Sequence, residues 1–257
     1  MVIVIHGMAE HSARYREVID FLNSRGIACC SFDQLGHGRS PSHERERGDV
    51  PSFDLFIAES VRVLETARAQ YPELPLFIWG HSMGAIIATL TAGRLGVDTP
   101  TRVRGVITSS PPTAAFDFLP KWALHFLRFA AWATPTIRLA RPFKPERLSR
   151  DLQVGLRYGE DTLVPKAITL RFLVQLAEAS AASVRLAHKL QIPWLVLHGD
   201  ADEIAPPIGS QRLFDALPGQ DKQIRLWPGA RHELHNEIEP TRSEMLQVMV
   251  EWMRARG

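Results

Sequence analysis

The sequence predicts an α/β fold with a doubly wound, mostly parallel sheet and a helical segment inserted into it. Three observations support this prediction. Short continuous apolar runs alternate with helical segments, one long stretch breaks that alternation, and one apolar run ends in a Gly-x-Ser-x-Gly pentapeptide. Parallel strands buried on both faces are expected to be apolar throughout. Strands that alternate with helices favour a parallel sheet covered by helices.

The expected elements follow in chain order from the apolar runs and the helix-capping residues. A first strand over 2–5 precedes a helix from Ser12 to about Arg25 and a second strand over 27–32, closed by a loop over 33–41. The other expected strands are 75–79, 103–108, 192–197 and 223–227, and the other expected helices are 52–71 or 54–71, 83–95, 210–217 and 241–256.

One stretch, from about residue 111 to 189, does not fit this alternation. It has helical periodicity, several prolines and no clear strand. We therefore interpret 111–189 as a helical cap inserted into a core that comprises residues 1–110 and 190–257. A chain of 257 residues is long enough for one such α/β domain with an insertion.

Within the cap, residues 116–132 are unusually rich in large apolar side chains. We expect this segment, with Trp122 and Phe126, to line the site of an apolar substrate. The alternative is that these aromatic residues only pack the cap onto the core. The cations that follow are expected to form a solvated face, with attraction to an anionic membrane surface as the alternative: Arg138, Arg141, Lys144, Arg147 and Arg150.

The bulk composition narrows the class of protein. A net charge of +2 is too small to indicate a nucleic-acid partner, which requires a concentrated basic face. No apolar run is long enough to span a bilayer, and no secretory leader is recognisable. The two cysteines, Cys29 and Cys30, are adjacent, and a disulfide between neighbours is strained. Reduced thiols and a cytoplasmic location are therefore expected.

The pentapeptide Gly80-His81-Ser82-Met83-Gly84 directly follows the apolar run 75–79 and precedes an apolar helical segment. A strand, a Gly-x-Ser-x-Gly turn and a helix in this order are typical of a nucleophile elbow. Such a turn presents one serine hydroxyl above the sheet at the start of a helix. Ser82 is therefore the predicted nucleophile.

A serine nucleophile needs a histidine base and a carboxylate that orients the base. In this type of fold they follow the serine in the order acid, then histidine, on loops after later strands. The strand over 192–197 is followed by Asp200 and Asp202, and the next strand by His232 and His235. We favour Asp202 and His232, and keep Asp200 and His235 as alternatives.

The tetrahedral intermediate also needs backbone donors for its oxyanion. One is expected to be the amide of Met83, which follows the serine at a helix N-terminus. The other is expected in the loop after the first strand, at Met8, which follows His6-Gly7.

Several motifs together resemble the monoacylglycerol lipase and lysophospholipase branch of the α/β-hydrolases, the serine aminopeptidase S33 group. Residues 6–15 resemble its HG-x-x-EHS-x-RY signature, and residues 33–40 its D-x-x-GHG-x-S loop. Residues 80–84 match GHSMG, and 148–151 resemble the cap motif LSRD. The resemblance also includes Asp161-Thr162-Leu163-Val164 and the histidine loop 232–237, so it covers nearly the whole chain.

The resemblance implies hydrolysis of a small lipid ester, most simply a monoacylglycerol, by Ser82, Asp202 and His232 without a cofactor or metal. The runner-up is a lysophospholipase or general carboxylesterase, followed by an aminopeptidase, a thioesterase or a catalytically silent binding protein. The resemblance further implies that Glu10, Arg14 and His235 approach the glycerol end of the substrate. The alternative for these three residues is a polar network that ties the first loop to the histidine loop.

Two further expectations come from comparison with the family pattern. The family has about 30 residues, forming two antiparallel strands, before the first parallel strand, whereas here Met1 directly precedes that strand. We therefore expect a sheet without those strands, and an exposed edge at 27–32 that favours self-association unless the natural protein starts upstream. A transient membrane-surface contact through the cap is also expected, while the residues do not indicate an oligomeric state.

Overall fold

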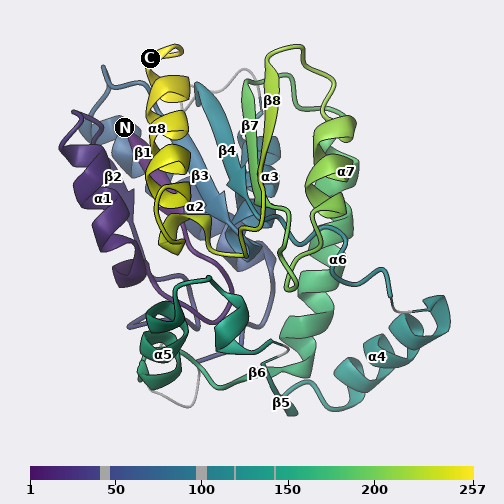
Figure 1. Ribbon diagram of the computed structural model, residues 1–257. Helices are drawn as coiled ribbons and strands as arrows, with labels where there is room; N and C mark the ends of the chain where they lie inside the picture. The colour runs from purple at the N-terminus through teal and green to yellow at the C-terminus, as the bar shows by residue number, and fades with distance from the viewer. Residues whose placement is uncertain (41–46, 97–102, 119, 142) are drawn as a thin grey trace.

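Six parallel strands form one sheet in the order β2-β1-β3-β4-β7-β8 (Figure 1). The structure is a computed structural model and describes residues 1–40, 47–96, 103–118, 120–141 and 143–257. Pro41 and Leu119, which belong to the predicted loop and the apolar cap segment, lie outside the described residues. The strands are β1 (Val2–Ile5), β2 (Cys29–Ser31), β3 (Phe77–His81), β4 (Gly105–Ser109), β7 (Trp194–Gly199) and β8 (Lys222–Trp227).

The continuous apolar runs become the central strands, because both faces of this sheet are covered. Every residue of β1, β3, β4 and β7 is buried. Successive side chains of β1 enter different cores: Val2 and Val4 belong to one cluster, while Ile3 and Ile5 belong to the other. The edge strands β2 and β8 are only partly buried. The predicted mostly parallel, doubly wound sheet is confirmed.

Helices cover the two faces of the sheet unequally. Side chains of α1 (Arg16–Asn23) and α8 (Thr241–Arg254) share one core cluster with the sheet. The other cluster contains side chains of α2 (Asp54–Gln70), α3 (Met83–Leu95) and α7 (Ile208–Ala216). Helix α3 is buried along most of its length, as its apolar sequence predicts.

The segment between β4 and β7 contains helices, and also two strands that the sequence analysis did not predict. They pair as an antiparallel ribbon, with Leu139 opposite Ile168. Each strand has only three residues, too few for an alternating pattern to stand out in the sequence. The elements of this segment are α4 (Lys121–Ala133), β5 (Arg138–Ala140), η3 (Pro145–Arg147), α5 (Leu152–Glu160), β6 (Ala167–Thr169) and α6 (Leu170–Ala187).

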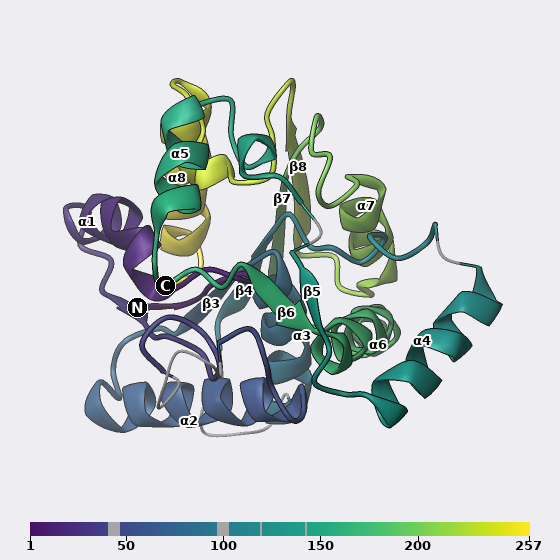
Figure 2. The same ribbon diagram turned by 90° about the horizontal axis from the view of Figure 1, so that it is seen from below.

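Helix α6 packs against α3 and joins the main core, although it belongs to the inserted segment. Phe172, Leu176 and Ala179 lie on its inner face in the same cluster as the sheet residues. Helix α4 packs against α6 at the periphery of the molecule, away from the sheet (Figure 2). The division into a core and a cap of residues 111–189 stays a prediction.

The predicted solvated cations of the inserted segment are partly engaged with the protein. Arg150 donates to Glu237 at 2.9 Å and to Thr241 at 2.9 Å. The guanidinium of Arg141 lies 4.8 Å from the centre of the Tyr158 ring.

Across the described ranges, no helix is both long and apolar enough to cross a membrane. Strand β2 pairs with β1 and forms one edge of the sheet.

Candidate active site

Ser82 occupies a sharp turn between β3 and α3. Its backbone has φ 52° and ψ −121°, a conformation that non-glycine residues rarely adopt. A Cβ on Gly80 would collide with the backbone of Gly84, and a Cβ on Gly84 would collide with the carbonyl of Ile5. Glycine is therefore required at both positions, as the elbow motif predicts. The turn places Ser82 at the N-terminus of α3.

The side chains of Ser82, His232 and Asp202 form a continuous hydrogen-bonded chain. Nε2 of His232 lies 3.0 Å from Oγ of Ser82, and its Nδ1 lies 2.6 Å from Oδ2 of Asp202. The three residues follow the carboxyl ends of β3, β7 and β8, which meet at one edge of the sheet. Both Asp202 and His232 are buried.

The two alternatives for the acid and base lie elsewhere. Asp200 is exposed and accepts a hydrogen bond of 2.6 Å from the amide of Gly229. His235 is buried, and its ring stacks on Tyr15 with 4.8 Å between centroids. Neither ring nitrogen of His235 has a hydrogen-bond partner in the described part of the chain. Asp202 and His232, the favoured residues, are thus the ones in contact with each other.

Asp202 is held as a carboxylate by the groups around it. Besides His232, it accepts hydrogen bonds from His198 at 2.9 Å and from the amides of Ile204 and Ala205 at 2.8 and 2.9 Å. Burial opposes ionisation, but the charge of His232 and the hydrogen bonds outweigh it and lower the pKa of Asp202. Burial also opposes protonation of His232, but Asp202 outweighs it and raises the pKa of that ring.

The loop after β1 lies directly against the nucleophile. A Cβ placed on Gly7 would lie 3.2 Å from Cβ of Ser82. The amide of Gly7 donates to Oε1 of Glu10 at 2.5 Å, and this oxygen also accepts from the hydroxyl of Tyr15 at 2.8 Å. Met8, the predicted second oxyanion donor, follows Gly7 in this loop.

Arg14 links this loop to the histidine loop. Its Nε donates to Glu10 at 3.2 Å, and its Nη2 donates to both oxygens of Glu233 at 2.7 and 2.8 Å. The guanidinium also lies 4.7 Å from the centre of the Tyr158 ring. The structure thus places Glu10 and Arg14 in a polar network between the two loops. Their predicted contact with a glycerol group stays a prediction, as does that of His235.

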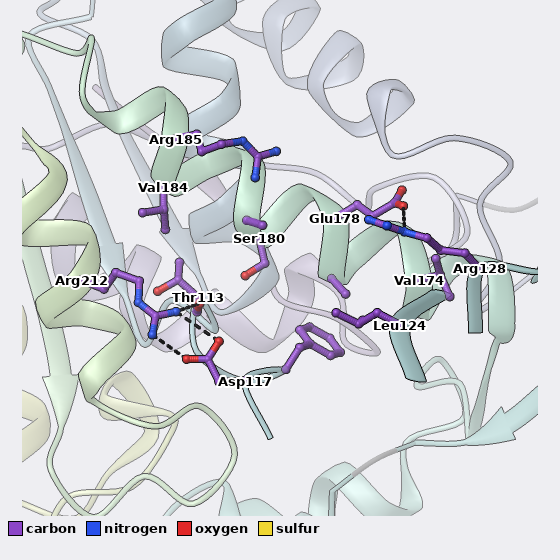
Figure 3. A pocket seen from close by; sticks show the side chains of 13 residues that line it. Thr113, Asp117, Leu124, Arg128, Val174, Glu178, Ser180, Val184, Arg185 and Arg212 are labelled. Carbon is purple, nitrogen blue, oxygen red and sulfur yellow. Dashed lines mark hydrogen bonds and ion pairs between the residues drawn. The ribbon is translucent and has the colours of Figure 1, made fainter. Parts of the chain in front are cut away.

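A groove of about 490 Å³ lies between α4, α6 and α7 (Figure 3). Two ion pairs lie along it, between Arg212 and Asp117 at 2.5 Å and between Arg128 and Glu178 at 2.7 Å. Thr113 on its lining comes shortly after β4, which pairs with the strand that precedes Ser82. Its apolar lining comes from Phe116, Leu124, Val174, Ala177, Ala181 and Val184.

The two aromatic residues predicted to line a substrate site lie outside this groove. Trp122 and Phe126 are on the exposed face of α4, with 73% and 63% of their surface accessible. Leu124 and Arg128, on another face of the same helix, contribute to the groove. The predicted substrate contact of Trp122 and Phe126 stays a prediction.

Four residues in contact with this site were not assigned a role from the sequence. His198 bonds to Asp202, and Glu233 to Arg14, while His6 and Gln34 hold the loop that contains Gly7. His6, Gln34 and Glu233 lie inside the recognised motifs, and this position in a motif could have marked them as residues near the site. His198 lies at the end of β7 and carried no such signal. In the described residues, no cluster of side chains suited to a metal ion occurs.

Comparison with known proteins identifies the family of this chain. A family profile described as serine aminopeptidase, S33, matches residues 1–239. The chain belongs to the serine aminopeptidase S33 family. The monoglyceride lipase of Rattus norvegicus is 32% identical over 262 residues, which cover 100% of this chain and 82% of that relative. The resemblance seen in the motifs is therefore confirmed.

Two further matches come from microorganisms. The crystal structure of the Paleococcus ferrophilus monoacylglycerol lipase superposes with a TM-score of 0.85 at 31% identity, over 100% of this chain and 94% of that one. Phospholipase YtpA of Bacillus subtilis is 26% identical over 93% of this chain and 90% of its own length. The α/β-hydrolase fold is thus confirmed, and the relatives are named as lipid ester hydrolases.

Proposed function

We propose that this chain is a serine hydrolase that cleaves carboxylic esters of lipids through an acyl-enzyme intermediate. The observation that carries the proposal is the chain of hydrogen bonds from Ser82 through His232 to Asp202, with the serine in a strained elbow. Membership of the S33 family and the names of the relatives support it. Ser82 is the nucleophile, His232 the general base and Asp202 the acid that orients it.

The reaction follows from these contacts. Oγ of Ser82 attacks the ester carbonyl while Nε2 of His232 takes the hydroxyl proton, and Asp202 stabilises the imidazolium. The tetrahedral intermediate then collapses, and His232 returns the proton to the departing alcohol oxygen. A water molecule, deprotonated by His232, attacks the acyl-enzyme and releases the fatty acid, which restores the Ser82 hydroxyl.

The oxyanion is received by the amides of Met8 and Met83. Met83 is the first residue of α3, where amides have no partner within the helix and favour negative charge. Met8 lies in the loop that contacts Ser82 through Gly7. Within the described ranges neither amide donates to another protein group. Both donors are therefore available to a substrate oxygen.

The acyl chain enters the groove between α4 and α6. Support comes from its apolar lining, its volume of about 490 Å³ and its closeness to the loop after β4. Each methylene removed from water contributes about 0.8 kcal/mol, so such a groove favours long chains over short ones. With the acyl chain on that side, the alcohol leaves on the side of Glu10 and Arg14, and monoacylglycerol is the simplest substrate.

A lysophospholipase is the second candidate, and one observation favours it. A cavity of about 400 Å³ lies beside Arg14, and its lining includes the cations Arg16 and Arg157 together with the carboxylates of Glu17 and Asp161. Neither Arg16 nor Arg157 makes an ion pair in the described part of the chain. Two such cations suit a phosphate group on the alcohol side of the ester. Phospholipase YtpA is among the relatives.

The exposed face of α4 is the proposed contact with a membrane surface. Four large apolar side chains of α4 are exposed there, namely Trp122, Phe126, Phe129 and Trp132. Exposed apolar surface of this kind marks interaction sites, and amphipathic helices bind the interfacial region of a bilayer. A lipid substrate would then reach the groove directly from the membrane. The free thiols of Cys29 and Cys30 agree with a cytoplasmic location.

Labelling with a fluorophosphonate followed by a substrate panel tests the proposal. An activated serine reacts with the probe, whereas a silent binding protein does not. The panel contains monoacylglycerols, lysophospholipids and p-nitrophenyl esters of several chain lengths. Turnover of monoacylglycerols above lysophospholipids supports the first candidate, and the reverse order supports the second. No labelling and no turnover would contradict both.

A further inference from the structure

The backbone of Gly7 is held by two buried side chains, one on each of its two peptide groups. Nδ1 of His6 lies 2.8 Å from the carbonyl oxygen of Gly7. The amide of Gly7, at the other side of the residue, donates to Oε1 of Glu10 at 2.5 Å. His6 and Glu10 are 1% and 3% exposed. The two contacts fix the backbone on either side of the Gly7 α-carbon.

The proton on the His6 ring can be assigned from its partners. The amide of Gln34 donates to Nε2 of His6 at 3.1 Å, and an amide nitrogen can only donate. The proton of the neutral ring is therefore on Nδ1, where it is donated to Gly7. Burial, helped by His37, lowers the pKa of His6 to about 3 and keeps the ring neutral. Gln34 also donates to the His6 carbonyl at 2.8 Å.

Glu10 is fixed in turn by its neighbours. Its Oε1 accepts from Gly7 and from Tyr15, and its Oε2 accepts from Arg14. The next residue back, Ala9, has φ 56°, and its carbonyl accepts a 2.7 Å hydrogen bond from Tyr158. A non-glycine residue in this conformation is strained and persists only where its surroundings hold it. The whole turn is thus held in one shape.

This arrangement decides where the amide of Met8 points. In a trans peptide the N–H lies opposite the C=O, so fixing the Gly7 carbonyl on His6 directs the Met8 N–H the other way. The loop contacts Ser82 through Gly7. We propose that His6 and Glu10 are positioning residues, which hold the Gly7–Met8 peptide so that its N–H meets the oxyanion formed at Ser82.

The inference rests on the proposed function and assigns Glu10 a role different from glycerol binding. Glu10 is 3% exposed, and both of its oxygens already accept hydrogen bonds from the protein. A residue that binds the alcohol would matter only for substrates that contain glycerol. A residue that positions an oxyanion donor matters equally for every ester, because every ester forms the same oxyanion.

The test compares two substrates and two kinds of variant. His6→Ala and Glu10→Leu remove the contacts to Gly7. His6→Asn keeps a donor near Nδ1, and Glu10→Gln keeps an oxygen that can accept from the Gly7 amide. Each is assayed on a monoacylglycerol and on a p-nitrophenyl ester, with active sites counted by complete fluorophosphonate titration. Glu65→Gln, on an exposed side chain of α2, is the matched control.

Loss of one oxyanion donor lowers kcat by about 10²–10³-fold, so we expect a loss approaching that size for His6→Ala and Glu10→Leu on both esters. KM should change little, and His6→Asn and Glu10→Gln should retain most of the activity. Affinity for a trifluoromethyl ketone, which mimics the tetrahedral intermediate, should fall in proportion to kcat/KM. Because rates are taken per titrated site, partial unfolding cannot produce this pattern.

Two results would overturn the inference while leaving the proposed function intact. One is an effect confined to the KM of the monoacylglycerol, which would make Glu10 an alcohol-binding residue. The other is unchanged kcat per titrated site in His6→Ala and Glu10→Leu, which would leave both residues only a structural role. If the unsubstituted protein hydrolyses neither ester, the proposed function itself fails and the inference fails with it.

Discussion

Oδ2 of Asp202 is shared by two histidine rings, with His232 at 2.6 Å and His198 at 2.9 Å. Nε2 of His198 also lies 2.9 Å from the carbonyl of Ala205, and its Nδ1 lies 2.6 Å from Oγ of Ser210. Both neighbours of Nε2 are acceptors, so this nitrogen carries the proton. His198, at the end of β7, therefore holds in place the carboxylate that orients His232.

Asn substitutions at Asp202 and Asp200 should show which of the two carboxylates is the catalytic acid. Asp202→Asn should lower kcat by about 10⁴-fold, because an amide favours the wrong tautomer of His232 and cannot stabilise its charge. Asp200→Asn should change kcat little, since Asp200 is exposed and its carboxylate accepts a hydrogen bond from the amide of Gly229 and not from a histidine. Steady-state kinetics on a p-nitrophenyl ester measures both. A larger loss for Asp200→Asn would require the acid to be reassigned.

Acid should destabilise the fold through buried neutral histidines. Burial lowers the pKa of His6 and His235 to about 3 and that of His37 to about 4, against 6.5 for the ordinary ring. Below pH 6.5 the unfolded chain binds protons that the folded chain does not. The free energy of unfolding should therefore fall as the pH drops from about 6.5 to 4, by up to about 1.4 kcal/mol per pH unit for each ring.

Urea unfolding at several pH values between 7 and 4.5 measures this dependence. His235→Phe preserves the stacking on Tyr15 but removes one titrating ring, so its stability should depend less steeply on pH. His188→Gln, on an exposed side chain, is the control. Equal slopes for His235→Phe and the unsubstituted protein would show that His235 takes up no proton on unfolding.

Alanine substitution should have opposite effects on stability at two glycines, Gly84 in the elbow and Gly159 in α5. In Gly84→Ala the new Cβ would meet the carbonyl oxygens of Ile5 and His6, so we expect a loss of stability of about 1–3 kcal/mol or more. Gly159 lies in a helix with open space around it, and Gly159→Ala should stabilise the protein by about 0.5–1 kcal/mol. Thermal melts compare the two. A neutral Gly84→Ala would contradict the close approach of α3 to β1.

Filling the groove should penalise long acyl chains. Ala177→Trp places a large ring in the groove, whereas Ala69→Trp adds the same ring to an exposed face of α2. We expect Ala177→Trp to lower kcat/KM for long-chain esters by about tenfold or more, which corresponds to two buried methylenes, and to spare acetate. Ala69→Trp should leave the chain-length profile unchanged. A uniform loss at all chain lengths would argue against acyl binding in the groove.

The exposed face of α4 should determine binding to lipid vesicles. Trp122→Ser and Phe126→Ser together should weaken binding to phosphatidylcholine vesicles without changing turnover of a water-soluble short-chain ester. Tyr71→Ser, which also removes an exposed aromatic ring but outside α4, is the control. Vesicle co-sedimentation measures the effect. Unchanged sedimentation of the α4 variant would remove the proposed membrane contact.

The sequence predicted the central strands and the elbow well because each depends on local patterns. Continuous apolar runs become strands buried on both faces, and the glycines around Ser82 are required by contacts with neighbouring backbone. The ribbon of β5 and β6 escaped prediction because three residues carry no reliable period. The contact of Glu233 with Arg14 also escaped it, since it joins residues that are far apart in the sequence. The contact of His198 with Asp202 escaped it because it depends on how the loop after β7 is folded.

Residues of α4 illustrate another limit of sequence patterns. An apolar helix face predicts burial, but not which surface covers it. Leu124 and Arg128 turn toward α6, whereas Trp122 and Phe126 lie exposed on the same helix. The position of α4 at the periphery of the molecule, and not its composition, decides which of its apolar side chains line the groove and which are exposed.

Mass spectrometry of the fluorophosphonate-treated protein shows whether Ser82 is an activated nucleophile. We expect one phosphonyl group per chain, attached to Ser82, with no adduct on Ser82→Ala and with labelling strongly slowed in His232→Ala. Each variant is first checked for folding by circular dichroism. A Ser82→Ala protein that is labelled at the same rate, or that still hydrolyses esters, would show that Ser82 is not the nucleophile.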